Sequence, residues 1–377
     1  MRTRAAILEE MGRPRPYATS RPLTVCEVEL APPARGEVLV RIAAAGLCHS
    51  DLSVINGDRP RPTPMALGHE AAGVVEALGE GVDDLAPGDH VVMVFVPSCG
   101  CCAPCAEGRP ALCEPAAKAN GAGEMLAGGR RLARGGAPLH HHLGVSAFAW
   151  HAVVSRRSLV RVPRDLPMER AALFGCAVLT GVGAVANTAR IAPGSSVAVI
   201  GLGGVGLAAV LGAVACGAGR IVALDLDPAK LELARGLGAS DAVDARDPEA
   251  ARQVRALTGG GVDFAFEMAG SARALELAWE ATRRGGTTVT AGLPNPAQRL
   301  QLPPVALVAE ERTLKGSYVG SCVPSRDIPR YVELHRQGRL PVERLLDGTI
   351  ALDGINEGFD RLAEGRSVRQ VVLFPAA

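Results

Sequence analysis

SVAVIGLGGVG, residues 196–206, is the stretch that decides the fold of this chain. Its apolar residues 197–200 predict a buried parallel strand, and the small and apolar residues that follow predict a helix packed closely against that strand. A second strand, over residues 220–224, ends at Asp225, 19 residues beyond Gly206. One G-x-G-x-x-G among 45 glycines would be a weak signal, but strand, glycines, helix, second strand and acid together predict a dinucleotide-binding unit.

Each residue of this loop has an expected role. Gly201 permits the tight turn, Gly203 lets a pyrophosphate approach the backbone, and Gly206 lets the helix approach the strand. The helix opens with Gly204 and Val205, and its free N–H groups would face the phosphates. We therefore expect a dinucleotide to bind at this loop.

Asp225 favours NAD as that dinucleotide. Its carboxylate would accept hydrogen bonds from both ribose hydroxyls and would repel a 2′-phosphate. Beyond it the alternation of strand and helix continues, which predicts a doubly wound parallel sheet. Helices are expected at 228–237, 248–257 and 271–283, and strands at 241–244, 262–267, 287–293 and 314–319.

Length and charge narrow the class of protein. A chain of 377 residues is long enough for two domains, and 40 basic against 39 acidic residues favour neither nucleic acid nor an anionic membrane as a partner. No apolar run without glycine approaches the roughly 18 residues of a membrane span, and residues 1–10 lack the core of a signal peptide. We therefore expect a cytoplasmic protein.

The two ends of the chain differ from its middle. Strand-like segments at 4–8, 23–30 and 37–43 are separated by prolines, which predicts an all-β beginning without helices. The tail from about residue 321 is mixed, with a helix expected at 327–337 and a last strand at 370–374.

Five of the ten cysteines lie within residues 99–113. Cys99, Cys102, Cys105 and Cys113 follow the spacing C-x2-C-x2-C-x7-C, which predicts a closed tetrahedral structural zinc site rather than a redox or disulfide loop. Cys101 should point away from the metal and is a candidate for oxidation. The spacing leaves open that Cys101 replaces Cys102 as a ligand.

Residues 114–145 are polar and rich in Gly, Ala and Arg, which predicts a long loop. The triplet His140, His141 and His142 lies near its end. We expect these imidazoles to be solvated rather than to bind a metal.

Three further motifs bring thiol, imidazole and carboxylate groups together: GLCHSD at 46–51, GHE at 68–70 and GC at 175–176. With the four-cysteine loop and the nucleotide unit, they make the chain resemble the zinc-dependent medium-chain alcohol dehydrogenases over almost its full length. The resemblance implies an α/β protein with a chaperonin-10-like, mostly β catalytic domain, residues 1–177 and 321–377. This domain would wrap around a doubly wound NAD-binding domain, residues 178–320. The long loop implies the homodimeric branch of the family.

By this resemblance, Cys48, His69 and Cys176 are the ligands of a catalytic zinc. Two thiolates and one imidazole would leave the fourth position open for water or substrate. Asp51 is implied as the acceptor that orients His69, and Glu70 as a carboxylate that can approach the metal.

The implied reaction is the reversible oxidation of an alcohol with hydride transfer to NAD. Zinc would lower the pKa of the substrate hydroxyl, and Ser50 would pass its proton toward the ribose. Ser53 stands where many relatives carry the last histidine of the relay, so we expect a shifted pH profile. His49 stands where relatives often carry an arginine, so we expect faster NAD release. The remaining implied cofactor contacts are Thr180, Lys230 and Arg369, the last as a cation near the phosphates.

The substrate stays open at this point. Ser50, Phe95, Leu143 and Phe148 are expected to line the pocket and favour primary or aryl alcohols. The alternative enzyme is a thiol-dependent formaldehyde dehydrogenase or S-nitrosothiol reductase, whose members carry a basic residue shortly after the fourth loop cysteine; Lys118 leaves this open. A nucleotide sensor or nucleic-acid-binding protein without turnover is disfavoured by the neutral charge and the open three-ligand site.

Overall fold

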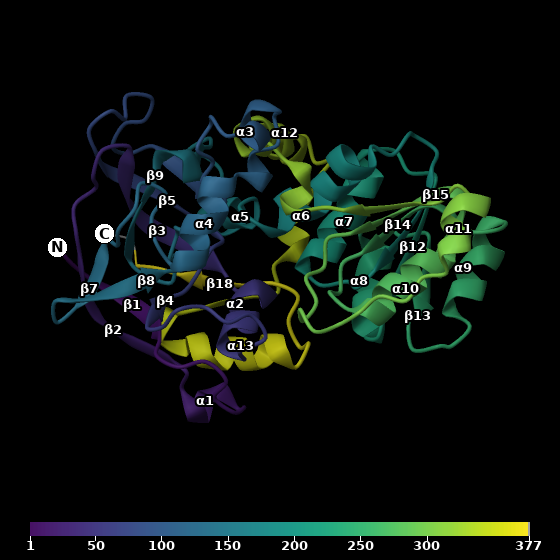
Figure 1. Cartoon of the computed structure of the whole chain (residues 1–377), viewed down its shortest axis with the longest axis horizontal. Helices are drawn as coiled ribbons and strands as arrows, with labels where there is room; N and C mark the ends of the chain where they lie inside the picture. Colours follow the sequence, from purple (N-terminus) through teal and green to yellow (C-terminus); the bar gives the residue numbers. More distant parts are fainter. Residues whose placement is uncertain (376–377) are drawn as a thin grey trace. The chain divides into compact units, whose positions relative to one another are not determined.

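The computed structural model describes residues 1–375, which form two compact units (Figure 1). The first unit comprises Met1–Cys176, Val323–Val332 and the chain from Leu346 onward, and the second comprises Ala177–Cys322 and Glu333–Leu345. The sequence predicts that 1–177 and 321–377 form the catalytic domain, but residues 177, 321–322 and 333–345 belong to the second unit. The segment 333–345 packs there because Arg339 and Arg344 donate hydrogen bonds to the carbonyl oxygens of Ala215 and Gly236.

Two β-sheets build the first unit. One is a closed barrel in the order β1–β2–β7–β8–β4, and the other has the order β10–β6–β5–β3–β18–β17, with β9 paired to β3. Apolar side chains of the barrel strands, such as Ile7, Val28 and Leu132, form one continuous core. The barrel strands are β1 (Arg2–Leu8), β2 (Leu23–Leu30), β4 (Met65–Ala66), β7 (Leu132–Arg134) and β8 (Ala137–His141), and the others are β3 (Glu37–Gly46), β5 (Ala71–Leu78), β6 (His90–Met93), β9 (His151–Ser155), β10 (Leu159–Arg161), β17 (Gly348–Ile350) and β18 (Gln370–Leu373).

Short helices connect these strands, and two of them correct the expectations. A helical turn, α1, interrupts the all-β beginning, and the stretch 114–145 holds α4 as well as β7 and β8 rather than one long loop. The stretch is ordered because β8 pairs with β7 and with β4. The helices are α1 (Tyr17–Ser20), α2 (His49–Ile55), α3 (Ala103–Ala106), α4 (Glu114–Ala122), α5 (Met168–Leu173) and α13 (Ile355–Ala363); α12 (Pro324–Arg336) begins in this unit and ends in the second.

The second unit is a doubly wound parallel sheet in the order β13–β12–β11–β14–β15–β16. The apolar run at 197–200 forms its central strand, and Ala198, Ile200 and Val222 lie in its buried core. β15 begins five residues before its expected start, directly after α10. The strands are β11 (Ser196–Ile200), β12 (Arg220–Asp225), β13 (Asp241–Asp244), β14 (Val262–Glu267), β15 (Thr282–Thr290) and β16 (Thr313–Gly316); the helices are α6 (Ala177–Gly183), α7 (Gly204–Ala215), α8 (Pro228–Gly236), α9 (Ala250–Thr258), α10 (Ala272–Ala281) and α11 (Pro304–Ala309).

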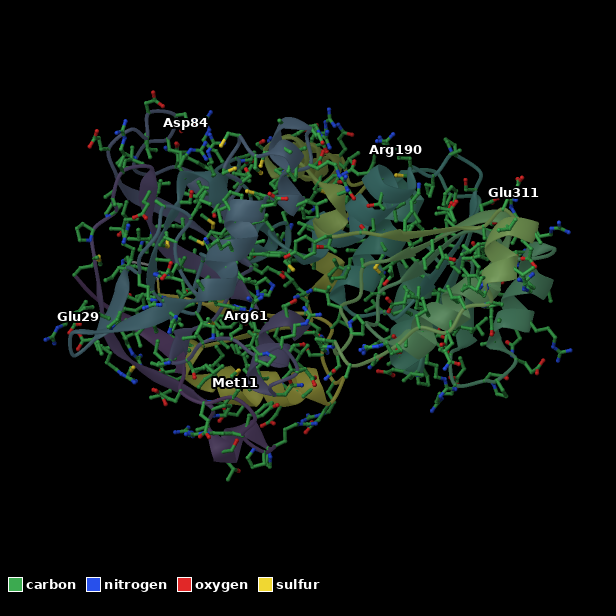
Figure 2. The ribbon with its side chains drawn as sticks, viewed as in Figure 1. Met11, Glu29, Arg61, Asp84, Arg190 and Glu311 are labelled. Atoms are coloured by element: carbon green, nitrogen blue, oxygen red, sulfur yellow. The ribbon has the colours of Figure 1, made fainter. Side chains whose placement is uncertain are left out.

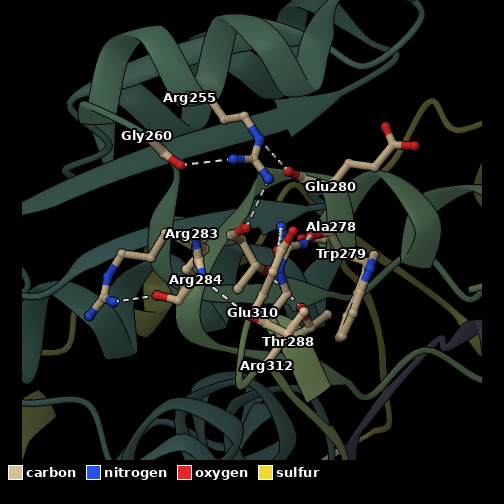
Figure 3. Close-up of polar contacts among 12 residues, drawn as sticks. Arg255, Gly260, Ala278, Trp279, Glu280, Arg283, Arg284, Thr288, Glu310 and Arg312 are labelled. Atoms are coloured by element: carbon tan, nitrogen blue, oxygen red, sulfur yellow. Dashed lines mark hydrogen bonds and ion pairs between the residues drawn. The ribbon is translucent and has the colours of Figure 1, made fainter. Parts of the chain in front are cut away.

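Arginine side chains brace the end of this sheet where β14 and β15 begin (Figure 3). Arg255 donates hydrogen bonds to the carbonyl oxygens of Glu280, Gly260 and Thr282 at 2.7, 2.9 and 3.2 Å. Arg312 donates to the Trp279 carbonyl oxygen at 2.7 Å and lies 5.1 Å from the centre of its ring. In a parallel sheet the opposite end carries the loops that bind ligands, so this network leaves the glycine loop free.

Among the described residues, no helix combines the length and apolar character that crossing a membrane would need.

Candidate metal centres and cofactor loop

Four side chains from three loops of the first unit converge at one buried point. Cys48 directly precedes α2, His69 and Glu70 lie between β4 and β5, and Cys176 follows α5. One ligand atom from each lies within 4.8 Å of those of the other three. Cys48 and Cys176 are 6% and 5% exposed, and His69 and Glu70 are fully buried.

The donor atoms of this group fit a zinc ion. A hydrogen bond from Cys176 holds the pKa of the Cys48 thiol well below its usual range, which favours the thiolate form that metals bind. The His69 Nδ1 atom lies 3.0 Å from Asp51 Oδ2, which leaves Nε2 for a metal. Two sulfurs and one imidazole are the ligands of an open zinc site.

Asp51 contacts a second imidazole, that of His142, in addition to the expected His69. Its Oδ1 atom lies 3.0 Å from His142 Nδ1 and accepts a hydrogen bond from the Gly68 N–H at 3.2 Å. Burial would raise the pKa of this carboxyl, but His69 and His142 together lower it. Asp51 therefore stays ionised and fixes His69 from behind.

The expectation that the histidine triplet is solvated is wrong for two of its members. His141 and His142 are 1% and 2% exposed, because β8 pairs with β4 and draws them inside. His141 Nε2 accepts a hydrogen bond from the Arg131 N–H at 2.9 Å, and burial lowers the pKa of His141 to about 3. The apolar run that follows the triplet at residues 143–149 was the signal that these histidines would be buried.

Glu70 forms a buried ion pair with Arg369. Arg369 Nη1 lies 3.1 Å from Glu70 Oε2 and donates to the Leu47 carbonyl oxygen at 2.9 Å. Burial raises the pKa of Glu70 to about 7, against the attraction of Arg369. Arg369 is 3% exposed, and Glu70 and the Leu47 carbonyl oxygen hold its Nη1 group. Its contact with the cofactor phosphates stays a prediction.

The expected proton relay begins at α2. Ser50 is half-buried in its first turn and His49 is exposed. The Ser53 hydroxyl donates to the His49 carbonyl oxygen at 2.8 Å, so as a relay group it would have to give up this bond.

The expected pocket residues divide into two groups. The Phe95 ring meets the His69 ring edge to face at 5.1 Å, and Leu143 is 8% exposed. Phe148 is fully buried and packs against Phe359 at 5.9 Å between ring centres, so it is a core residue and does not belong to the pocket.

The four-cysteine loop forms a second convergent group. Ligand atoms of Cys99, Cys102, Cys105 and Cys113 lie within 4.8 Å of one another, which resolves the open register in favour of Cys102. Backbone N–H groups of Cys101 and Cys102 lower the pKa of Cys99 to about 6. Four sulfurs so arranged fit a closed structural zinc site.

The glycine loop lies in the second unit, and its three glycines differ in their surroundings. Gly201 has a φ of +90°, and a Cβ atom at Gly206 would overlap the Gly201 carbonyl oxygen. A Cβ at Gly203 would meet nothing within 4 Å, so only a ligand can require glycine there. Gly204 and Val205 open α7, as expected.

Asp225 has a second role that the motif did not reveal. Its Oδ2 atom accepts a hydrogen bond from the Leu202 N–H at 2.6 Å, and Oδ1 accepts one from the Asp227 N–H at 3.0 Å. The carboxylate therefore holds the glycine loop while free lone pairs remain for a ribose.

The two other expected cofactor contacts of the second unit lie on helices. Thr180 is buried in α6, and Lys230 is half-buried in α8.

Known proteins resemble the chain over its whole length. A family described as "Zinc-binding dehydrogenase" matches residues 204–337, and one described as "Alcohol dehydrogenase GroES-like domain" matches residues 34–164. The S-(hydroxymethyl)glutathione dehydrogenase of Escherichia coli O1:K1 / APEC is 38% identical, with 99% of this chain and 100% of that protein covered. An alcohol dehydrogenase zinc-binding domain protein from Burkholderia ambifaria has a TM-score of 0.94 at 36% identity, and benzyl alcohol dehydrogenase from Acinetobacter calcoaceticus has 0.93 at 32%, each with both chains fully covered.

Proposed function

This chain belongs to the zinc-dependent medium-chain alcohol dehydrogenase family and is an NAD-dependent oxidoreductase that acts on alcohols; from this premise we propose that it reversibly oxidises primary or aryl alcohols to aldehydes. The observation that carries the proposal is the buried convergence of Cys48, His69 and Cys176 within 4.8 Å. A zinc ion held there would act as a Lewis acid that lowers the pKa of the substrate hydroxyl.

The protein's own side chains supply the rest of the chemistry. Ser50, two residues after Cys48, accepts the hydroxyl proton and passes it on. Asp51 keeps His69 in the tautomer whose Nε2 binds metal. Glu70 and Arg369 place a compensated charge pair beside the ligands.

The second unit binds the hydride acceptor. The Gly203 backbone leaves room for the pyrophosphate, and the N-terminus of α7 supplies N–H donors. Asp225 accepts the ribose hydroxyls, while Thr180, Lys230 and His49 add contacts. These assignments favour NAD over NADP because a 2′-phosphate would meet the Asp225 carboxylate.

A substrate screen tests the proposal. NADH formation is followed with aliphatic, benzylic and diol substrates, and zinc is measured by mass spectrometry. We expect turnover of a benzylic alcohol without added thiol and two zinc ions per chain. Cys176→Ser should lose activity and one zinc, whereas Cys102→Ser should lose the other zinc. Turnover that survives in Cys176→Ser would refute the assignment.

The second candidate is thiol-dependent formaldehyde oxidation, which the name of the Escherichia coli relative favours. The adduct of formaldehyde with a thiol is itself a primary alcohol, so the same site could oxidise it. Lys118 is exposed on α4 and offers a cation for an acidic thiol. NADH formation from formaldehyde only when glutathione is present, with no benzylic turnover, would favour this candidate over the first.

We also propose a homodimer in a reducing, cytoplasmic compartment, with which the absence of a disulfide among the ten cysteines agrees. β16 lies at the edge of the sheet, and α11, which precedes it in the chain, carries exposed large apolar side chains. Val305 and Val308 are 70% and 81% exposed, so a two-fold contact with a second copy would remove them from water. Val308→Asp should halve the mass seen by analytical ultracentrifugation, whereas Val214→Asp, on α7, should not. A monomeric native protein would contradict this proposal.

A further inference from the structure

Cys101 is a fifth thiol that touches the four-cysteine site without belonging to it. It is exposed, and its Sγ atom lies 3.7 Å from Cys99 Sγ. Its N–H group donates to the same sulfur at 3.5 Å. When Cys99, Cys102, Cys105 and Cys113 hold zinc, Cys101 is the one thiol of the loop that is not engaged.

The turn between the two thiols suits a bond between them. Gly100 lies between them with a φ of +81°, and the two sulfurs are in contact across this turn. The sulfurs lie 3.7 Å apart, so they need to approach each other by about 1.7 Å to reach the bonding distance of about 2.05 Å.

Solvent and small oxidants can reach this place. Gly100 and Cys105 line an open cavity of about 1030 Å³ in the first unit. The Arg157 guanidinium covers the Gly100 turn, so that a Cβ at Gly100 would lie 2.9 Å from its Cζ atom. Cys101 is the exposed thiol of the loop, so an oxidant in the solvent can reach its sulfur.

We propose that Cys101 is a redox modification site that releases the structural zinc by forming a disulfide with Cys99. The Cys101 sulfur attacks hydrogen peroxide; an S–O bond forms, the O–O bond breaks, and one water leaves. Cys99 then leaves the metal and attacks the Cys101 sulfur, the S–S bond forms, and hydroxide departs and takes up a proton as the second water. The two sulfurs lose two electrons, which the peroxide gains.

Only Cys102, Cys105 and Cys113 would then remain to hold the zinc, and the loss of one thiolate would weaken its binding. A chain of contacts within the first unit connects the four-cysteine loop with the catalytic site. Cys113 directly precedes α4, and Asn120 on α4 donates to the Phe95 carbonyl oxygen at 3.0 Å. The Phe95 ring contacts His69. Arg61, which is labelled in Figure 2, donates to the Asn120 carbonyl oxygen at 3.3 Å.

The test uses the zinc-loaded enzyme and hydrogen peroxide in the presence of a chelating dye. We expect one zinc per chain to be released, a mass loss of two hydrogens, and a Cys99–Cys101 disulfide by peptide mapping. A neighbouring thiol acts at millimolar effective concentration or above, so Cys101→Ser should release zinc about tenfold more slowly. Cys216→Ser, which removes a distant half-buried thiol, should behave as the native protein. Dithiothreitol with zinc should restore the native mass and metal content.

Equal release rates in the native protein and Cys101→Ser would overturn the proposal. So would a singly oxidised Cys101 with both zinc ions retained. Should Cys101→Ser fail to load two zinc ions, Cys101→Ala provides the same comparison. None of these readouts depends on turnover, so they stay interpretable whichever alcohol is the substrate.

Discussion

The two variants Gly203→Ala and Gly206→Ala should separate a glycine that a ligand requires from one that the fold requires. Gly203 has φ −72° and ψ −173°, a conformation that alanine adopts freely, and its added Cβ meets nothing within 4 Å. Alanine there should leave the fold intact and add about 0.4–1 kcal/mol of stability by restricting the unfolded chain. At Gly206 the added Cβ would overlap the Gly201 carbonyl oxygen and lie 2.9 Å from its carbon. Because both atoms are backbone, we expect a loss of about 3 kcal/mol.

The affinity for NAD should fall in Gly203→Ala through a direct clash with the cofactor. In Gly203→Ala the methyl group occupies the space left for the pyrophosphate, an overpacking cost of about 1–3 kcal/mol. This corresponds to a Kd for NAD raised by about 5- to 150-fold. Any loss of affinity in Gly206→Ala would follow from a displaced loop instead.

Trp279 lies in the second unit and Trp150 in the first, so a Trp150→Phe background lets urea unfolding be read from the unit that holds the loop. NAD binding is measured by titration calorimetry in the same background. An unchanged NAD affinity in a stable Gly203→Ala protein would refute pyrophosphate binding at this loop. Native stability of Gly206→Ala would refute the close packing of α7 on β11.

Three further variants test single groups. Ser50→Ala should keep two zinc ions by metal analysis while kcat falls by about 10²- to 10⁴-fold, since it removes only the proton acceptor; full activity would exclude Ser50 from the relay. Asp225→Asn keeps an acceptor for the Leu202 N–H but loses its charge, so the NADP-to-NAD ratio of kcat/KM should rise about tenfold, and an unchanged ratio would contradict the charge argument. In the folded protein the pKa of His141 is about 3, whereas in the unfolded chain it is about 6.5. Because the unfolded chain binds a proton that the folded protein does not, the free energy of unfolding falls as the pH drops below about 6.5. Relative to pH 8, native protein should lose about 1.4 kcal/mol at pH 5.5 from this group, a loss that urea unfolding of His141→Gln should lack.

Features that depend on neighbouring residues could be predicted from the sequence. One strand–helix–strand unit contains the run at 197–200, the glycines after it and Asp225. The structure confirms this unit as β11, α7 and β12 of the parallel sheet. The cysteine spacing predicted a closed site because short spacers by themselves bring sulfurs together, and the four expected sulfurs do converge. The gathering of Cys48, His69 and Cys176 came from resemblance, since no local rule joins residues so far apart.

Only the tertiary structure decided which distant groups share a partner. His142 reaches Asp51 because β8 pairs with β4. The polar, glycine-rich sequence of residues 114–145 does not predict this pairing. Arg369 meets Glu70 because β18 lies beside β3, and the convergence of Cys99, Cys102, Cys105 and Cys113 leaves Cys101 outside the ligand group. Hydrophobic periodicity and short motifs encode local conformation. The contacts of a buried polar group depend instead on which strands pair, and that is settled by the packing of the whole unit.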